Sequence, residues 1–173
     1  YDIMLAKNGE EALKMAKENE PDLIITDMMM PVMDGTKLCT SLKQDLSTSH
    51  IPIIMLSAKA EKEDELNALK SGADDFVAKP FSMSILKAKI GNILRTQYRL
   101  QAKVSKSIEI TPEKISFNTM DEAFLQNAIS IVERNMDNSD FSTEEFASEM
   151  NMSRSNLHLK LKALTGESAL DLI

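Results

Sequence analysis

The stretch PDLIITDMMMP, residues 21–31, joins a continuous apolar run to an acidic residue and then to a turn. The run Leu23–Ile25 is entered at Pro21 and stops at Asp27. A short apolar run between such turn residues is typical of a β-strand buried on both faces. Three further runs of this kind are Tyr1–Ala6, Ile51–Leu56, which ends at Ser57, and Asp75–Ala78, which ends at Lys79-Pro80.

Between these runs, apolar residues recur with the period of an α-helix, as Leu38, Leu42 and Leu46 do. The predicted helices are Glu10–Asn19, Thr36–Leu46, Lys62–Lys70, which Gly72 caps, and Ser82–Leu100. Short apolar strands that alternate with amphipathic helices predict an α/β fold with a doubly wound parallel sheet. Such sheets bind their ligands at the carboxyl ends of the strands.

The pattern changes after residue 100. Residues 101–119 are rich in Ser and Thr and are predicted to be a linker, with one short extended piece at Ile108–Ile110. From residue 120 the pattern is helical without strands. Helices are expected around Phe124–Val132, over Ser142–Met150 and over Ser153–Leu164, which Gly166 caps. The sequence therefore predicts a domain over 1–100, a linker over 101–119 and a small all-α domain over 120–173.

Composition excludes several classes of protein. The 173 residues include 20 Lys and Arg against 27 Asp and Glu, and the net charge of −7 argues against a wholly basic nucleic-acid binder. The single cysteine, Cys39, excludes an internal disulfide framework and fits a reducing compartment. No apolar run approaches the roughly 20 residues of a membrane span, and no signal peptide opens the chain. We expect this segment in the cytoplasm without membrane contact, even if its parent protein is membrane-anchored.

Side chains suited to phosphoryl transfer follow three of the predicted strands. Asp27, Ser57 and Lys79 each end a strand, so in a parallel sheet they meet at one edge. The carboxylate would be the nucleophile, while the hydroxyl and the ammonium bind phosphoryl oxygens and offset their charge. Mg²⁺ normally completes such a site. Each residue alone has a structural explanation, as a turn, cap or surface residue, and only the combination predicts function.

Three motifs carry a resemblance to a known family: DMMMPVMDG at 27–35, MLSA at 55–58 and GADDFVAKPF at 72–81. Residues 1–100 resemble the receiver domain of two-component response regulators, which has a flavodoxin-like fold. The resemblance implies that Asp27 is the phosphoacceptor, Ser57 the switch hydroxyl and Lys79 the phosphate-binding lysine. It also implies that Phe76 is the switch aromatic and that Asp27 and the Met29 carbonyl bind Mg²⁺. The phosphodonor would be a histidine kinase domain, in the same chain or another.

The sequence departs from the family at its start. The family's first strand, the acidic pair that ends it and the following helix have no counterpart before Tyr1, and we interpret the chain as a cropped piece of a longer protein. An alternative is a receiver-like interaction module that acts without phosphorylation. A haloacid-dehalogenase type phosphatase would need a second Asp where Met29 stands. This segment is not expected to be a turnover enzyme itself, and whether its parent includes a histidine kinase stays open.

The second half contains a possible helix-turn-helix. Ser142 and Glu145 form a capping-box pattern, and Ser153 is placed to cap the next helix, in which Leu157, Leu161 and Leu164 are spaced to face a core. Two helices with a tight turn between them are typical of DNA-binding proteins, although any helical bundle has the same spacing. The polar, non-acidic residues predicted to contact DNA are Arg154, Ser155, Asn156, His158 and Lys160.

The string from Phe141 through Ser153 to Gly166 resembles the AraC-type DNA-binding domain. That family joins two helix-turn-helix units by a long helix, and only the first unit is present over 121–173. Leu159 departs from the family, which often places a polar residue there. The order of receiver and AraC-type domain resembles the C-terminal part of hybrid sensor kinases. It implies a phosphorelay that controls transcription through DNA binding and homodimer formation on activation.

Overall fold

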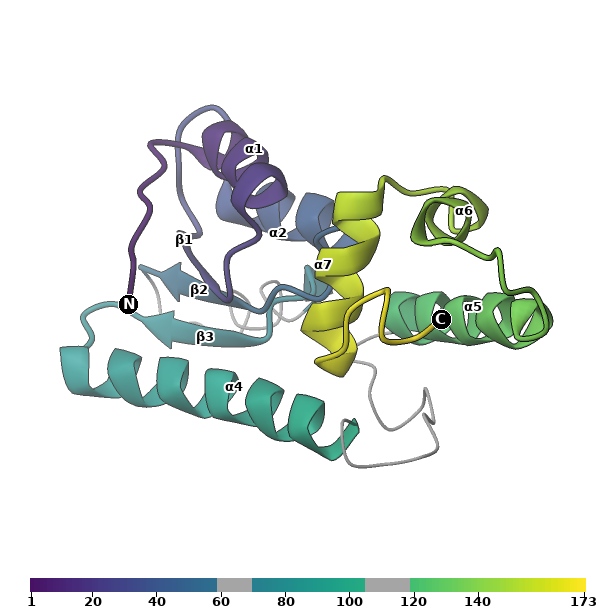
Figure 1. Cartoon of the computed structure of the whole chain (residues 1–173). Helices are drawn as coiled ribbons and strands as arrows, with labels where there is room; N and C mark the ends of the chain where they lie inside the picture. Colours follow the sequence, from purple (N-terminus) through teal and green to yellow (C-terminus); the bar gives the residue numbers. More distant parts are fainter. Residues whose placement is uncertain (59–69, 105–118) are drawn as a thin grey trace. The chain divides into compact units, whose positions relative to one another are not determined.

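A computed structural model of the chain describes residues 1–58, 70–104 and 119–173, which form two compact units, Tyr1–Arg95 and Thr96–Ile173 (Figure 1). The first unit contains α1 (Gly9–Asn19), β1 (Ile24–Asp27), α2 (Gly35–Gln44), β2 (Ile53–Ser57), β3 (Asp75–Ala78) and the first part of α4 (Met83–Val104). The second contains the end of α4, α5 (Thr119–Asn135), α6 (Thr143–Glu149) and α7 (Arg154–Thr165).

The first unit is built on a parallel sheet with the strand order β1-β2-β3. The first unit has one apolar core on each face of this sheet, and alternate residues of β2 point into the two cores. Ile53 and Met55 pack with α1 and α2, whereas Ile54 packs with Val77 and with Leu86 of α4. Figure 1 shows the same layers, with α1 and α2 on one face of the sheet and α4 on the other. The predicted α/β parallel sheet is therefore confirmed.

Residues 1–6 do not form the predicted strand. Tyr1, Ile3 and Leu5 are exposed, at 91%, 78% and 84% of their full surface. A strand needs a neighbour to satisfy its backbone N–H and C=O groups. Among the described residues the sheet has three strands, and none of them pairs with this segment. The apolar composition alone was therefore misleading here.

Side-chain caps start the two helices on the upper layer of the sheet in Figure 1. Asn8 accepts a hydrogen bond from the N–H of Glu11 at 3.0 Å and begins α1, and Asp34 accepts one from the N–H of Lys37 at 2.8 Å and begins α2. Of the predicted helix Lys62–Lys70, only Lys70 lies within the described residues. The predicted extended piece Ile108–Ile110 lies outside them. Within the described parts of the chain, no helix is both long and apolar enough to cross a membrane.

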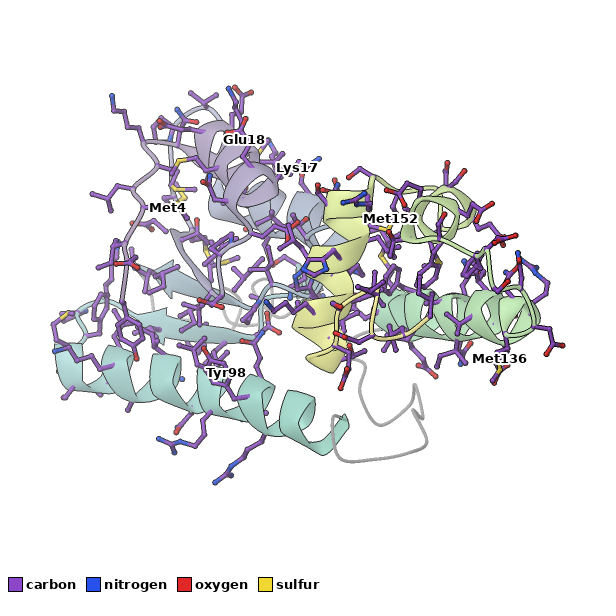
Figure 2. The ribbon with its side chains drawn as sticks, in the orientation of Figure 1. Met4, Lys17, Glu18, Tyr98, Met136 and Met152 are labelled. Carbon is purple, nitrogen blue, oxygen red and sulfur yellow. The ribbon has the colours of Figure 1, made fainter. Side chains whose placement is uncertain are left out.

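The second unit has its own apolar core. Phe124, Leu125, Ala128 and Ile131 of α5 are buried, as are Phe146 and Ala147 of α6 and Leu157, Leu161 and Leu164 of α7. Met136, which follows α5, is 76% exposed and points away from the core in Figure 2. The three helices predicted from the spacing of apolar residues are confirmed, with Gly166 in the left-handed conformation at the end of α7.

Candidate functional site

The carboxyl ends of the three strands lie in register. Asp27 of β1 is opposite Leu56, and Ser57 of β2 is opposite Ala78. The hydrogen bonding between strands extends one residue beyond the ends of β1 and β3. The N–H of Met28 donates to the carbonyl of Leu56 at 2.8 Å, and the N–H of Lys79 donates to the carbonyl of Ser57 at 2.7 Å. The strand-end residues Asp27, Ser57 and Lys79 therefore come to the same edge of the sheet.

Asp27 and Lys79 form an ion pair at this edge, in which the Lys79 ammonium donates to Oδ2 of Asp27. The other carboxylate oxygen, Oδ1, accepts a hydrogen bond from the N–H of Met29 at 3.3 Å. The two side chains retain 33% and 38% of their exposure, so the pair is open to a reagent from solution. The arrangement holds a nucleophilic carboxylate beside a cation that neutralises added negative charge.

The loop after Asp27 returns tightly to the strand end because residue 35 is glycine. The N–H of Gly35 donates to the carbonyl of Met28 at 3.0 Å, and a Cβ at this position would lie 2.2 Å from the carbonyl oxygen of Asp27. Such an approach is open only to glycine. Gly35 therefore positions the loop that carries Met29 against the phosphoacceptor candidate.

Ser57 is less accessible than Asp27, whereas Phe76, like Asp27, is half-buried. Ser57 is 1% exposed at the end of β2. Phe76 is half-buried in β3, opposite Met55, and packs against the cluster formed by α1, α2 and β2. The sequence placed Ser57 correctly at the edge, whereas Phe76 lies three residues before Lys79 and contacts the layer of α1 and α2.

The described residues do not by themselves fit a complete magnesium site. Mg²⁺ prefers six oxygen ligands in nearly octahedral geometry. Asp27 supplies a carboxylate, but no group of three or more His, Cys, Asp or Glu side chains that could hold a metal occurs among the described residues. The acidic pair that the resemblance implies therefore has no counterpart in this part of the chain.

The predicted helix-turn-helix segment is formed by local signals. Ser142 and Glu145 make a reciprocal capping box at the start of α6, and the rings of Phe141 and Phe146 lie 6.0 Å apart across it. After α6, Asn151 adopts the left-handed conformation with φ +55°, and the N–H of Met152 donates to the carbonyl of Ala147 at 2.9 Å. Asparagine tolerates this conformation well, which explains a tight turn without glycine.

The structure corrects one predicted DNA contact. Lys160 is fully buried, with Nζ 2.8 Å from Oδ1 of Asp121 and 5.0 Å from the ring centroid of Phe124. It follows the core spacing of Leu157, Leu161 and Leu164, so it faces the interior and not solvent. A lysine in this place does not reach a phosphate.

The remaining predicted residues of α7 are accessible to different degrees. Ser155 and Arg154 are exposed, and Asn156 and His158 are half-buried. Arg154 already pairs with Glu144 of α6. The pKa of Glu144 is lowered by a hydrogen bond from its own backbone and then by Arg154. Because two of the three cations between residues 151 and 164 have acidic partners within the unit, this stretch is less basic than its sequence indicates.

Two residues that were not predicted as DNA contacts belong to the outer face of α7. Leu159 is 41% exposed and Lys162 is exposed. With Ser155 and His158 they are spaced at i, i+3, i+4 and i+7, opposite the buried stripe. In the sequence, this spacing is the signal that Lys162, and not Lys160, is the lysine of α7 that faces solvent.

Comparison with known proteins gives several matches to the first unit and one relative that matches almost the whole chain. A family model described as "Response regulator receiver domain" matches residues 1–91. A protein named "Histidine kinase P4" from Formosa agariphila is 43% identical over 165 residues, which cover 95% of this chain and 12% of that protein. The "Alkaline phosphatase synthesis transcriptional regulatory protein PhoP" of Bacillus subtilis is 45% identical over 95 residues, 55% of this chain and 39% of that protein. The chain thus spans well under half of these relatives.

Solved structures agree with the observed fold. The signal receiver domain of a signal transduction histidine kinase from Syntrophus aciditrophicus has a TM-score of 0.52 and 34% identity, over 64% of this chain and 79% of that one. A CheY-like receiver domain protein from Methanospirillum hungatei has a TM-score of 0.53 and 26% identity, over 57% of this chain and 78% of that one.

Proposed function

The chain belongs to the response regulator receiver family, which acts in phosphorelay signalling, and from this premise we propose that Asp27 is its phosphoacceptor. The observation that carries the proposal is the partly exposed pair of Asp27 and Lys79 at the carboxyl edge of the sheet. A carboxylate that is held by a cation, yet open to solvent, is suited to accept a phosphoryl group.

The phosphodonor we propose is the phosphohistidine of a histidine kinase, in the same protein or another. A carboxylate oxygen of Asp27 forms a bond to phosphorus while the phosphorus–nitrogen bond breaks. The imidazole leaves with the electron pair of that bond and takes up a proton. The ammonium of Lys79, which already lies on Asp27, stays beside the transferred group and offsets its charge. The product is an acyl phosphate on Asp27.

We propose that Ser57 and Phe76 respond to this phosphoryl group. Ser57 is buried in the described state, so a hydrogen bond from its hydroxyl to a phosphoryl oxygen requires a rearrangement at the end of β2. Phe76 is half-buried on the adjacent strand and is free to change its packing with that rearrangement. Phosphorylation would thus shift the population between two arrangements of this edge.

For the second unit we propose DNA binding by an AraC-type helix-turn-helix, with α7 in the major groove. The capped α6, the tight turn at Asn151 and the outer face of Ser155, His158, Leu159 and Lys162 support this proposal. Phosphorylation of the receiver would favour pairing of two copies on DNA. One relative that matches 95% of this chain is named a histidine kinase. This match supports a hybrid protein in which kinase, receiver and output are joined.

A second candidate function is an interaction module that works without phosphorylation. The observation that favours it is the incomplete set of metal ligands around Asp27 in the described residues. The two candidates differ in one measurable property, which is whether Asp27 takes up a phosphoryl group.

The deciding experiment treats the intact protein with acetyl phosphate, with and without Mg²⁺, and measures the added mass of one phosphoryl group. We expect labelling in the wild type and none in Asp27→Asn. Asp34→Asn is the matched control, because asparagine still caps α2 and the charge removed is the same. Labelling of Asp27→Asn at the wild-type level, or no labelling of the wild type, would sink the phosphoacceptor proposal.

A further inference from the structure

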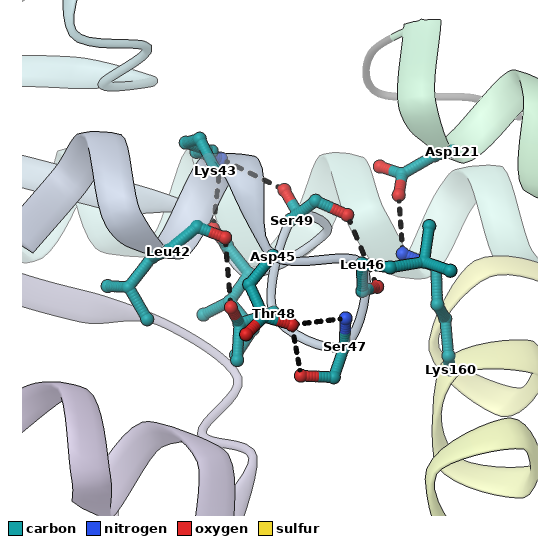
Figure 3. Close-up of polar contacts among 10 residues, drawn as sticks. Leu42, Lys43, Asp45, Leu46, Ser47, Thr48, Ser49, Asp121 and Lys160 are labelled. Atoms are coloured by element: carbon teal, nitrogen blue, oxygen red, sulfur yellow. Dashed lines mark hydrogen bonds and ion pairs between the residues drawn. The ribbon is translucent and has the colours of Figure 1, made fainter. Parts of the chain in front are cut away.

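The most deeply buried charges described in this chain lie between α5 and α7. Lys160 and Asp121 both have side chains that are 0% exposed, and Nζ of Lys160 lies 2.8 Å from Oδ1 of Asp121. Figure 3 shows the lysine extending from α7 to the carboxylate at the start of α5. The ammonium also lies 5.0 Å from the ring centroid of Phe124, in the range of a cation–π contact.

Stability alone does not account for this pair. Removing two charges from water costs more than their attraction commonly returns, and well-packed apolar residues of similar size often stabilise as well or better. The same face of α7 already contributes Leu157, Leu161 and Leu164 to the core, each 0% exposed. An apolar residue at position 160 would continue that stripe. What the ion pair adds is a preferred geometry, because its charge-assisted hydrogen bond weakens as distance and angle depart from their optimum.

We propose that Asp121 and Lys160 are positioning residues for α7, which fix its rotation about its own axis and thereby determine DNA sequence preference without touching DNA. The inference rests on the proposed DNA-binding function and names what controls it.

The geometry of α7 makes rotation consequential. Its outer face, Ser155, His158, Leu159 and Lys162, is opposite the stripe that contains Lys160. Side-chain ends lie about 5–6 Å from a helix axis, so a rotation of about 10° moves them by about 1 Å. A shift of that size breaks the alignment that hydrogen bonds to base edges need, whereas contacts to phosphates tolerate it.

The test compares the intact protein with the double variant Asp121→Leu, Lys160→Met. DNA selected from a random pool by the wild type and a scrambled duplex of equal length serve as probes. Because the double variant keeps the net charge, we expect an unchanged salt dependence on the scrambled duplex. We expect the ratio of affinities for selected over scrambled DNA to fall about tenfold or more.

Two controls separate positioning from other effects. The double variant Arg134→Gln, Glu149→Gln removes an exposed ion pair between α5 and α6 and should keep the ratio. Lys162→Ala removes an outward charge, so it should weaken binding to both duplexes alike and reduce the salt slope.

The outcomes distinguish the inference from its premise. A wild type that binds no DNA, or binds both duplexes equally, overturns the DNA-binding proposal and the inference with it. A wild type with a clear preference, and a folded double variant with the same ratio, overturns the inference alone. If the double variant does not fold, Lys160→Arg decides on the same ratio, since it keeps the charge and enlarges a side chain with no exposed surface.

Discussion

Asp45 shows how the fold sets the charge of a single residue. Burial raises the pKa of its carboxyl, but hydrogen bonds from Lys17 and Ser47 outweigh burial and hold the pKa below its usual value. Nζ of Lys17 lies 2.5 Å from Oδ2 of Asp45, and both the N–H and the hydroxyl of Ser47 donate to Oδ1, the latter contacts being drawn in Figure 3. The ionised form is therefore preferred in the folded state.

The pKa of Asp45 leads to a prediction about pH. Because the folded-state pKa is lowered, ionised Asp45 stabilises the fold at pH values above its unfolded-state pKa of about 4. This stabilisation is lost as pH falls through the folded-state pKa. Asp45→Asn, which keeps the bonds from Ser47, should lower the free energy of unfolding by about 1 kcal/mol at pH 7. The difference from the wild type should shrink below about pH 4. Urea denaturation across this range measures it, with Glu18→Gln of the exposed pair with Lys14 as control. A difference that is independent of pH would contradict it.

The residues of the candidate site were predictable to the extent that their positions depend on local sequence. Asp27, Ser57 and Lys79 each follow an apolar run, and a strand end is recognised from its neighbours alone. Lys160 was misassigned because its charge suggested solvent, while its partner Asp121 lies 39 residues away. The buried spacing that Lys160 shares with Leu157 and Leu161 is present in the sequence, but the charge of a lysine favours solvent unless a buried partner such as Asp121 is known.

At the scale of elements, the helices were predicted within a few residues because caps and apolar period are local. Asn8, Asp34 and Ser153 cap helices through their own side chains. The segment Tyr1–Ala6 shows the opposite case, because a strand depends on a hydrogen-bonded neighbour that composition does not reveal.

Gly91 offers a prediction for the element α4. This glycine lies within a helix of 22 residues, and a Cβ added to it meets nothing within 4 Å among the described residues. Gly91→Ala should therefore raise the free energy of unfolding by about 0.5–1 kcal/mol, the difference in helix propensity. Gly35→Ala should lower it, because its Cβ would meet the carbonyl oxygen of Asp27 at 2.2 Å. Chemical denaturation measures both, and a destabilised Gly91→Ala would show that this helix face is already packed.

At the scale of the whole molecule, each of the two units buries a core of its own. Leu42 of α2 is 0% exposed within Tyr1–Arg95, and Leu161 of α7 is 0% exposed within Thr96–Ile173. Units with separate cores are expected to unfold separately. The division of labour we propose, with phosphorylation in the first unit and DNA binding in the second, depends on this independence.

Core truncation tests that independence. Leu161→Ala removes buried volume and should lower the free energy of unfolding of the second unit by about 2–5 kcal/mol, a large part of the stability of a small domain. Hydrogen exchange should increase in α5, α6 and α7, while labelling of Asp27 by acetyl phosphate stays near the wild-type level. Leu42→Ala should instead lower the labelling of Asp27 and leave hydrogen exchange in α5, α6 and α7 unchanged, because Leu42 packs in the cluster that includes Phe76 and Met55. If Leu161→Ala lowered labelling in proportion to its loss of stability, the two units would fold as one, and phosphorylation would act on the output through a shared core.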